Sequence, residues 1–83
     1  SKSTEYKKET FTNSQEDNKY SLQNFPVEDN SELIFINGFS QTKDIDYYIN
    51  YEKGIVTFIN KTIPDGQNVE IAYNYFLSNT LKS

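Results

Sequence analysis

Apolar and polar residues alternate with a period of two along residues 69–76, which is the pattern of a half-buried β-strand. Every second side chain there is large and apolar or aromatic: Val69, Ile71, Tyr73 and Tyr75. Residues 55–59 alternate in the same way and place Val56 and Phe58 on one face. Both segments are therefore predicted to be strands that turn one face to a core.

Two further segments predict strands by their composition. Residues 32–36, ELIFI, form a continuous apolar run that is too short for a buried helix. Residues 46–51, DYYINY, are rich in aromatic and β-branched side chains. From the four segments together we expect one core that contains Phe35, Val56, Phe58, Val69, Ile71 and Tyr73.

Two turn signals separate these strands. Asn37-Gly38 fits a two-residue type I′ loop, which needs positive φ at both central positions. Pro64-Asp65-Gly66 predicts a second turn, in which proline fixes φ at the first central position, aspartate takes the second and glycine follows. We therefore expect reverse turns at both places.

The N-terminal part of the chain is much more polar. In residues 1–19 only Tyr6 and Phe11 could anchor a core. We interpret residues 4–12 and 19–24 as a weak hairpin, or residues 1–19 as a polar arm that pairs with a sheet edge of its own domain or of a neighbouring subunit. The alternative is a disordered arm, since two aromatics offset little of the ordering cost.

No segment shows a sustained helical period, so the fold class is predicted to be all-β. Residues 1–83 should form one domain, a small antiparallel β-sandwich or partly open barrel of about six strands. We expect its main core in residues 32–76, and we interpret residues 77–83 as a polar tail.

The amino-acid composition limits the partners and the catalytic chemistry that we expect. The chain has no cysteine and no histidine, and its twelve acidic residues outnumber eight lysines, which gives a net charge of −4. Nucleic-acid and anionic-membrane partners call for a basic surface, so we expect neither. Without a thiol, an imidazole or a glycine-rich phosphate loop we also expect no catalytic residues, no enzyme activity, no cofactor and no small-molecule substrate.

The acidic residues offer two candidate features. Asp44 and Asp46 could form half of a calcium or magnesium site, but too few further oxygen ligands lie nearby, so we expect Asp46 to accept backbone N–H groups at a turn instead and predict no metal site. Glu28, Asp29 and Glu32 form an acidic loop, which we interpret as solvated surface.

Aromatic residues are the one class in surplus, with seven tyrosines and six phenylalanines. Adjacent strand residues point to opposite faces, so Tyr47 and Tyr48 cannot both enter one core. Tyrosine is enriched in protein interfaces, so tyrosines at the surface predict contacts with other proteins. Stacking against carbohydrate and simple cross-strand pairing are the alternative interpretations. The predicted protein-contact residues are Tyr6, Phe11, Tyr48, Tyr51 and Tyr75.

The order of elements over residues 9–76 resembles bacteriophage virion proteins, notably tail-fibre attachment domains and small tail or neck proteins. In that pattern an apolar strand ends in Asn-Gly, an Asp-Tyr pair opens the next strand, a Gly-x-x-x-Phe strand and a Pro-x-Gly turn follow, and the last strand alternates. The matching residues are Phe35, Asn37, Gly38, Asp46, Tyr47, Gly54, Phe58, Pro64, Gly66, Val69, Ile71 and Tyr73.

This resemblance implies a non-enzymatic structural protein of the virion, assembled in the host cytoplasm, that binds other virion subunits and forms a homo-oligomer in the particle. Tail-fibre attachment domains precede a trimeric shaft that this sequence lacks, so a single fibre domain or a separate tail, neck or head-decorating protein would both fit. The alternatives are a carbohydrate- or surface-binding β module that uses surface tyrosines, and a small regulatory protein of a prophage.

Overall fold

The computed structural model, which describes residues 3–77, contains seven strands in two antiparallel sheets. The four-stranded sheet has the order β1-β7-β3-β4, and the three-stranded sheet has the order β2-β6-β5. The strands are β1 (Thr4–Phe11), β2 (Lys19–Ser21), β3 (Leu33–Ile36), β4 (Phe39–Ser40), β5 (Tyr47–Asn50), β6 (Ile55–Phe58) and β7 (Val69–Phe76). A short 3₁₀ turn, η1 (Glu16–Asn18), precedes β2.

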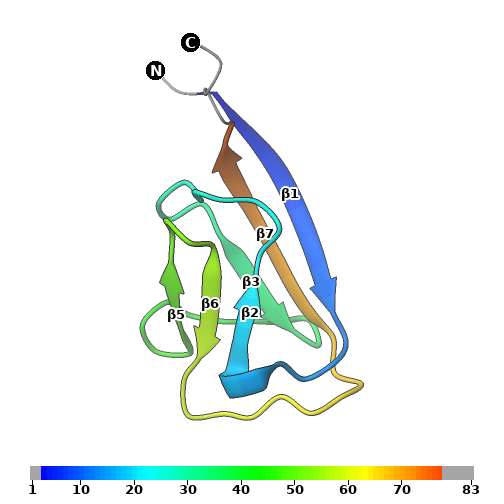
Figure 1. Cartoon of the computed structure of the whole chain (residues 1–83). Helices are drawn as coiled ribbons and strands as arrows, with labels where there is room; N and C mark the ends of the chain where they lie inside the picture. Colours follow the sequence, from blue (N-terminus) through cyan, green and yellow to red (C-terminus); the bar gives the residue numbers. More distant parts are fainter. Residues whose placement is uncertain (1–2, 78–83) are drawn as a thin grey trace.

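Figure 1 shows the sheets as two layers, with β1 and β7 running side by side as the longest strands. The prediction of an all-β antiparallel fold is confirmed, and the sheets do not close into a barrel. Within residues 3–77, no helix has the length and apolar character needed to cross a membrane.

The core lies between the two sheets and draws side chains from both. Tyr20 occupies its centre, fully buried, with its ring edge-on to Phe11 of the other sheet and to Phe58 of its own, at centroid separations of 5.1 and 5.2 Å. Such edge-to-face pairs stabilise a core beyond the area that they bury. The buried cluster is Tyr20, Leu22, Val27, Ile34, Tyr47, Val56, Phe58, Ile63, Val69, Ile71 and Tyr73.

Five of the six predicted core residues belong to this cluster, but the assignment of Phe35 was wrong. Ile34 lies opposite Ile71 and is buried, and its neighbour Phe35 therefore points to the outer face, opposite Glu70. A continuous apolar run has no alternation, so either face of β3 could have been the inner one.

The predicted N-terminal hairpin is also wrong. β1 pairs with β7 along its whole length, whereas β2 pairs with β6 in the other sheet. Residues 12–18 cross between the layers, and both Asp17 and Asn18 adopt positive φ in the η1 turn. The polar segment is thus ordered on its own domain, because backbone pairing with β7 needs few apolar side chains.

Both predicted turns are present, one of them shifted. Asn37 and Gly38 have φ of 50° and 84°, which is the type I′ loop expected between β3 and β4. In the second turn Gln67 N donates to Pro64 O, so Asp65 and Gly66 are the central pair, one residue later than predicted.

Gly38→Val should destabilise the domain by more than about 1 kcal/mol. A β-branched residue is strained at φ of +84°, even though no atom lies within 4 Å of the position that its Cβ would take. Chemical denaturation would measure the loss, with Gly38→Asn as the control, since asparagine tolerates this conformation. Equal losses for the two variants would contradict the argument.

Tyr20→Phe should leave the stability unchanged or raise it by about 1 kcal/mol. The Tyr20 hydroxyl is buried, and none of the side or main chains in residues 3–77 gives it a hydrogen-bond partner. Phenylalanine keeps both ring contacts and removes the unsatisfied polar atom. Thermal unfolding of the two chains would test this, and a marked loss of stability would show that the hydroxyl is satisfied in solution.

Candidate functional site

The acidic loop contains a buried carboxylate, which corrects the expectation that its three acids are solvated. Glu32 is only 9% exposed and accepts hydrogen bonds from the hydroxyls of Tyr47, at 2.7 Å, and Tyr51, at 3.0 Å. Glu28 is half-buried and accepts a bond from Asn74, whereas Asp29 is exposed as expected. Glu32 therefore joins the loop before β3 to the aromatic side chains of β5 and the turn after it.

A second buried carboxylate, Glu9, lies on the inner face of β1. It accepts hydrogen bonds from the Tyr73 hydroxyl and, at 2.9 Å, from the backbone N–H of Gln23. Burial, followed by this hydrogen bond to Glu9, raises the pKa of Tyr73 to about 12. The pKa of Tyr47 is raised further, again by burial first and then by its bond to Glu32. The sequence signal for Glu9 was its place two residues before Phe11, on the same face of a strand.

Stability should therefore fall as the pH rises above about 10, the ordinary tyrosine pKa. Tyr73 has a higher pKa folded than unfolded, so its contribution is complete below pH 10 and is lost as the pH rises through about 12. Urea denaturation at a series of alkaline pH values would show the decline, and Tyr73→Phe should make it shallower. An unchanged slope in that variant would contradict the assignment.

The Asp44–Asp46 pair has a structural role at Asp46. The Asp46 carboxylate accepts the backbone N–H of Thr42 at 2.6 Å and lies 3.3 Å from the Lys61 ammonium. The backbone bond is the main cause that lowers the pKa of Asp46, followed by Lys61. Across the part of the chain that the structure covers, no three acidic side chains gather where they could hold a metal ion.

The structure separates the five predicted contact residues into two groups. Tyr6 and Tyr48 are 67% and 57% exposed, and Tyr48 points away from the core while its neighbour Tyr47 is buried, as expected. The other three make contacts inside the domain: Phe11 packs on Tyr20, Tyr51 binds Glu32, and Tyr75 donates to Glu5. Tyr6 and Tyr48 lie on the outer faces of different sheets, so they belong to different surfaces.

The first surface is an apolar band on the outer face of the four-stranded sheet. The strand register places Leu33 beside Ala72, and Tyr6 diagonally next to Ala72 and Phe76. Leu33 is 61% exposed, which is high for a large aliphatic side chain in the middle of a sheet. We define the outer band as the exposed Tyr6 and Leu33 together with the half-buried Phe35 and Phe76 and the buried Ala72.

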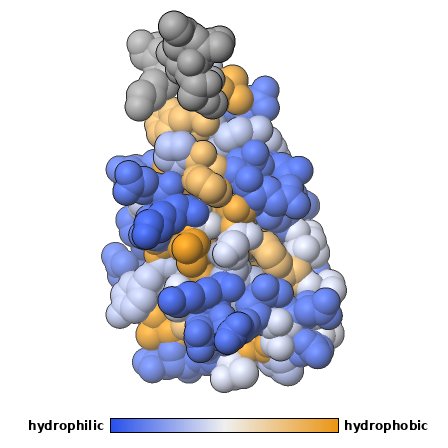
Figure 2. Space-filling view, viewed as in Figure 1, coloured by the Kyte–Doolittle hydropathy of each residue, from blue (hydrophilic) through white to orange (hydrophobic). Residues whose placement is uncertain are grey.

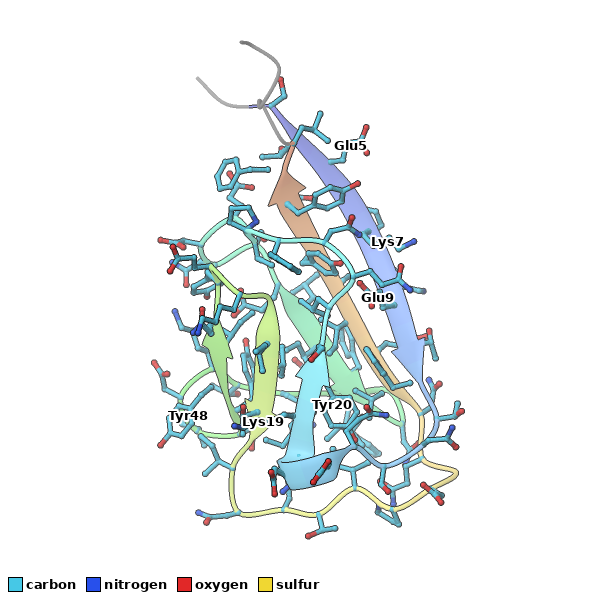
Figure 3. All side chains as sticks on the ribbon, in the orientation of Figure 1. Glu5, Lys7, Glu9, Lys19, Tyr20 and Tyr48 are labelled. Atoms are coloured by element: carbon cyan, nitrogen blue, oxygen red, sulfur yellow. The ribbon has the colours of Figure 1, made fainter. Side chains whose placement is uncertain are left out.

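The second surface is an open depression of about 340 Å³ on the outer face of the three-stranded sheet. Lys19, Thr57 and Tyr48 lie side by side across its three strands, and Lys53 follows in the turn after β5. Figure 3 shows Lys19 and Tyr48 toward the same end of this sheet. The face seen in Figure 2 is mainly hydrophilic, with separate apolar spots. We call this depression the Tyr48 pocket; no acidic residue lines it.

Comparisons with protein-family models, with curated proteins and with solved structures found no match to this chain.

Proposed function

We propose that the protein is a non-enzymatic structural module of a bacteriophage virion that docks onto other virion subunits through its four-stranded sheet. The observation that carries the proposal is the outer band, whose residues Tyr6 and Leu33 are more than half exposed on an otherwise regular sheet. Exposed, contiguous apolar surface bordered by polar groups is typical of protein interaction sites. The Lys8–Glu70 ion pair, at 3.8 Å, borders the band.

The resemblance of the sequence pattern to that of tail and neck proteins supports the same proposal. Its elements correspond to the strands and turns of the fold: Asn37-Gly38 forms the β3–β4 turn, and Tyr47 begins β5. The buried carboxylates of Glu9 and Glu32 each accept hydrogen bonds from tyrosine hydroxyls inside the domain, and neither residue lines the Tyr48 pocket. Their contacts support a structural role rather than a catalytic one.

The test is incorporation into particles. Virions of the phage that carries the gene should contain the chain, and Leu33→Glu should reduce its amount in purified particles, because a buried charge would oppose docking. Ile45→Glu is the matched control, since Ile45 is 70% exposed and lies on a loop outside the band. Mass spectrometry of the particles gives the measurement, and circular dichroism confirms that both variants fold. Particles that lack the wild-type chain would refute the proposal.

A second candidate function, binding of acidic carbohydrate, is favoured by the Tyr48 pocket. An exposed tyrosine offers a face for a sugar ring, and Lys19 and Lys53 would attract a carboxylate or phosphate group on it. Tyr48→Ala should then abolish retention on an immobilised acidic polysaccharide, whereas Phe39→Ala, which removes another exposed aromatic, should not. Equal retention of both variants would exclude this function.

A further inference from the structure

The edge strand β1 presents backbone groups that have no partner on one side. Leu77 N donates to Ser3 O, so residues 3 and 77 form a hydrogen-bonded pair, and such pairs recur at every second residue of an antiparallel ladder. The odd-numbered residues of β1 therefore bond to β7. The even-numbered ones point their N–H and C=O groups away from it: Thr4, Tyr6, Lys8 and Thr10.

The hydrogen bonds on the other side of β7 support this assignment of bonded and open residues. Its even-numbered residues bond in the other direction, where Glu28 N donates to Asn74 O and Phe76 N donates to Pro26 O. Among the backbone hydrogen bonds found within residues 3–77, none engages the open side of β1. An edge strand of eight residues whose outer backbone groups are unpaired is a template for pairing with another strand.

We propose that two copies of the chain pair through this edge, β1 against β1 and antiparallel, with the two-fold axis at Tyr6. The inference rests on the proposed function, because it names the homotypic contact by which such a module would assemble. It joins the two four-stranded sheets into one continuous sheet of eight strands.

The charges along β1 select this register. Figure 3 shows Glu5, Lys7 and Glu9 following one another along the strand. When Tyr6 lies opposite the partner's Tyr6, Glu5 lies opposite the partner's Lys7, and the symmetry repeats this pair. Opposite charges directly across a ladder are favourable, and like charges are unfavourable. The arrangement therefore forms two complementary ion pairs around the axis.

Axes at Glu5, Lys7 or Lys8 would also use the open side of β1 and would keep the inner and outer faces of the two copies aligned. These three registers are unfavourable. An axis at Glu5 sets two glutamates against each other, and an axis at Lys7 sets two lysines against each other. An axis at Lys8 does the same with that lysine, and its compensating pair would need Glu9, which is buried and already bound to Tyr73. Among the axes from Glu5 to Lys8, only the one at Tyr6 avoids like charges. Axes at Thr4 and Thr10 also avoid them, but they overlap only the ends of the two strands and form no ion pair.

The same register is consistent with the outer face. There Tyr6 would contact the partner's Tyr6, and aromatic pairs across strands stabilise a sheet. Thr4 would lie opposite the partner's Lys8, with no clash of charge. Because Tyr6 belongs to the outer band, the pairing would also extend that band across both copies.

Cysteine cross-linking tests the register, since the chain has no cysteine of its own. Tyr6→Cys should form a disulfide-linked dimer under mild oxidation, because Cα atoms of a hydrogen-bonded antiparallel pair lie about 5.5 Å apart, within disulfide range. Thr4→Cys alone should not, since its two copies would be about 13 Å apart along the strand. A mixture of Thr4→Cys and Lys8→Cys chains should cross-link as heterodimers.

Charge reversal tests the ion pairs without a cross-link. By sedimentation equilibrium, Lys7→Glu and Glu5→Lys should each weaken the dimer by about tenfold or more, since each removes two attractive pairs and introduces repulsion. The double variant Glu5→Lys/Lys7→Glu restores opposite charges and should dimerise like the wild type. It also loses the bond from Tyr75 to Glu5, as does Glu5→Lys alone, so this loss cannot explain a recovery.

A monomeric wild-type chain, a double variant as weak as the single ones, or disulfide dimers of Thr4→Cys alone would each overturn the pairing. These results are independent of the particle experiment. If the chain is monomeric but is incorporated into virions in a manner that depends on Leu33, the β1 pairing is wrong and the docking function stands. If the chain dimerises as expected but is absent from particles, the pairing stands and the virion function is wrong.

Discussion

Phe58→Ala is expected to lower the free energy of unfolding by roughly 3–5 kcal/mol, a large share of the whole stability of a domain this small. Phe58 is 3% exposed and holds the ring of Tyr20 edge-on at 5.2 Å, so alanine would leave a cavity in the centre of the core. The surrounding strands β5 and β2 are fixed by their ladders to β6 and can close that space only in part.

Urea denaturation of the two chains would measure this loss, with Phe39→Ala as the matched control. Phe39 is 74% exposed, so the same substitution there should change the stability by no more than about 0.5 kcal/mol. Similar losses at both positions would mean that the assigned faces of β6 and β4 are wrong.

Glu32→Ala should be the most destabilising substitution in the acidic loop, at about 1–3 kcal/mol or more. The buried Tyr47 hydroxyl would lose the carboxylate that accepts its hydrogen bond at 2.7 Å, and Tyr51 would lose the same partner. Glu32→Gln keeps an acceptor oxygen and should cost less. Thermal and urea unfolding would rank the variants.

Asp29→Ala is the control for this loop, because Asp29 is exposed and lies three residues before Glu32. It should leave the stability within about 0.5 kcal/mol of the wild type. If Asp29→Ala and Glu32→Ala were equally mild, the Glu32 carboxylate would be solvated, as the sequence had suggested, and the buried network would be refuted.

The two proposals make different demands on the four-stranded sheet. Docking onto virion subunits uses its outer face, where Leu33 is exposed, whereas the pairing of two copies uses the open edge of β1. Tyr6 is common to both, since its side chain lies on the face and its backbone lies on the edge. Substitutions at Leu33 and Lys7 therefore separate the two contacts.

Local sequence signals were enough to predict several elements of the fold. Alternation assigned the inner faces of β6 and β7 correctly, because one residue of shift would have turned Val56 and Ile71 out of the core. Asn37-Gly38 specified its turn, since few other residue pairs tolerate positive φ at both positions. The opposite orientations of Tyr47 and Tyr48 followed from strand geometry alone.

Other features depend on partners that are distant in the sequence and become apparent only in the folded domain. Backbone hydrogen bonds carry no sequence identity, so nothing within residues 4–11 indicates that β1 pairs with β7 instead of β2. Phe35 faces outward because the ladder to β7 sets Ile34 against Ile71 in the core.

The buried carboxylates depend on distant partners most of all. A carboxylate is buried only where donors surround it. The donors around Glu9 and Glu32 include the hydroxyls of Tyr73 and Tyr47, which lie 64 and 15 residues away from them in the sequence. The ladder between β1 and β7 brings Tyr73 next to Glu9, and the packing of the two sheets brings Tyr47 next to Glu32.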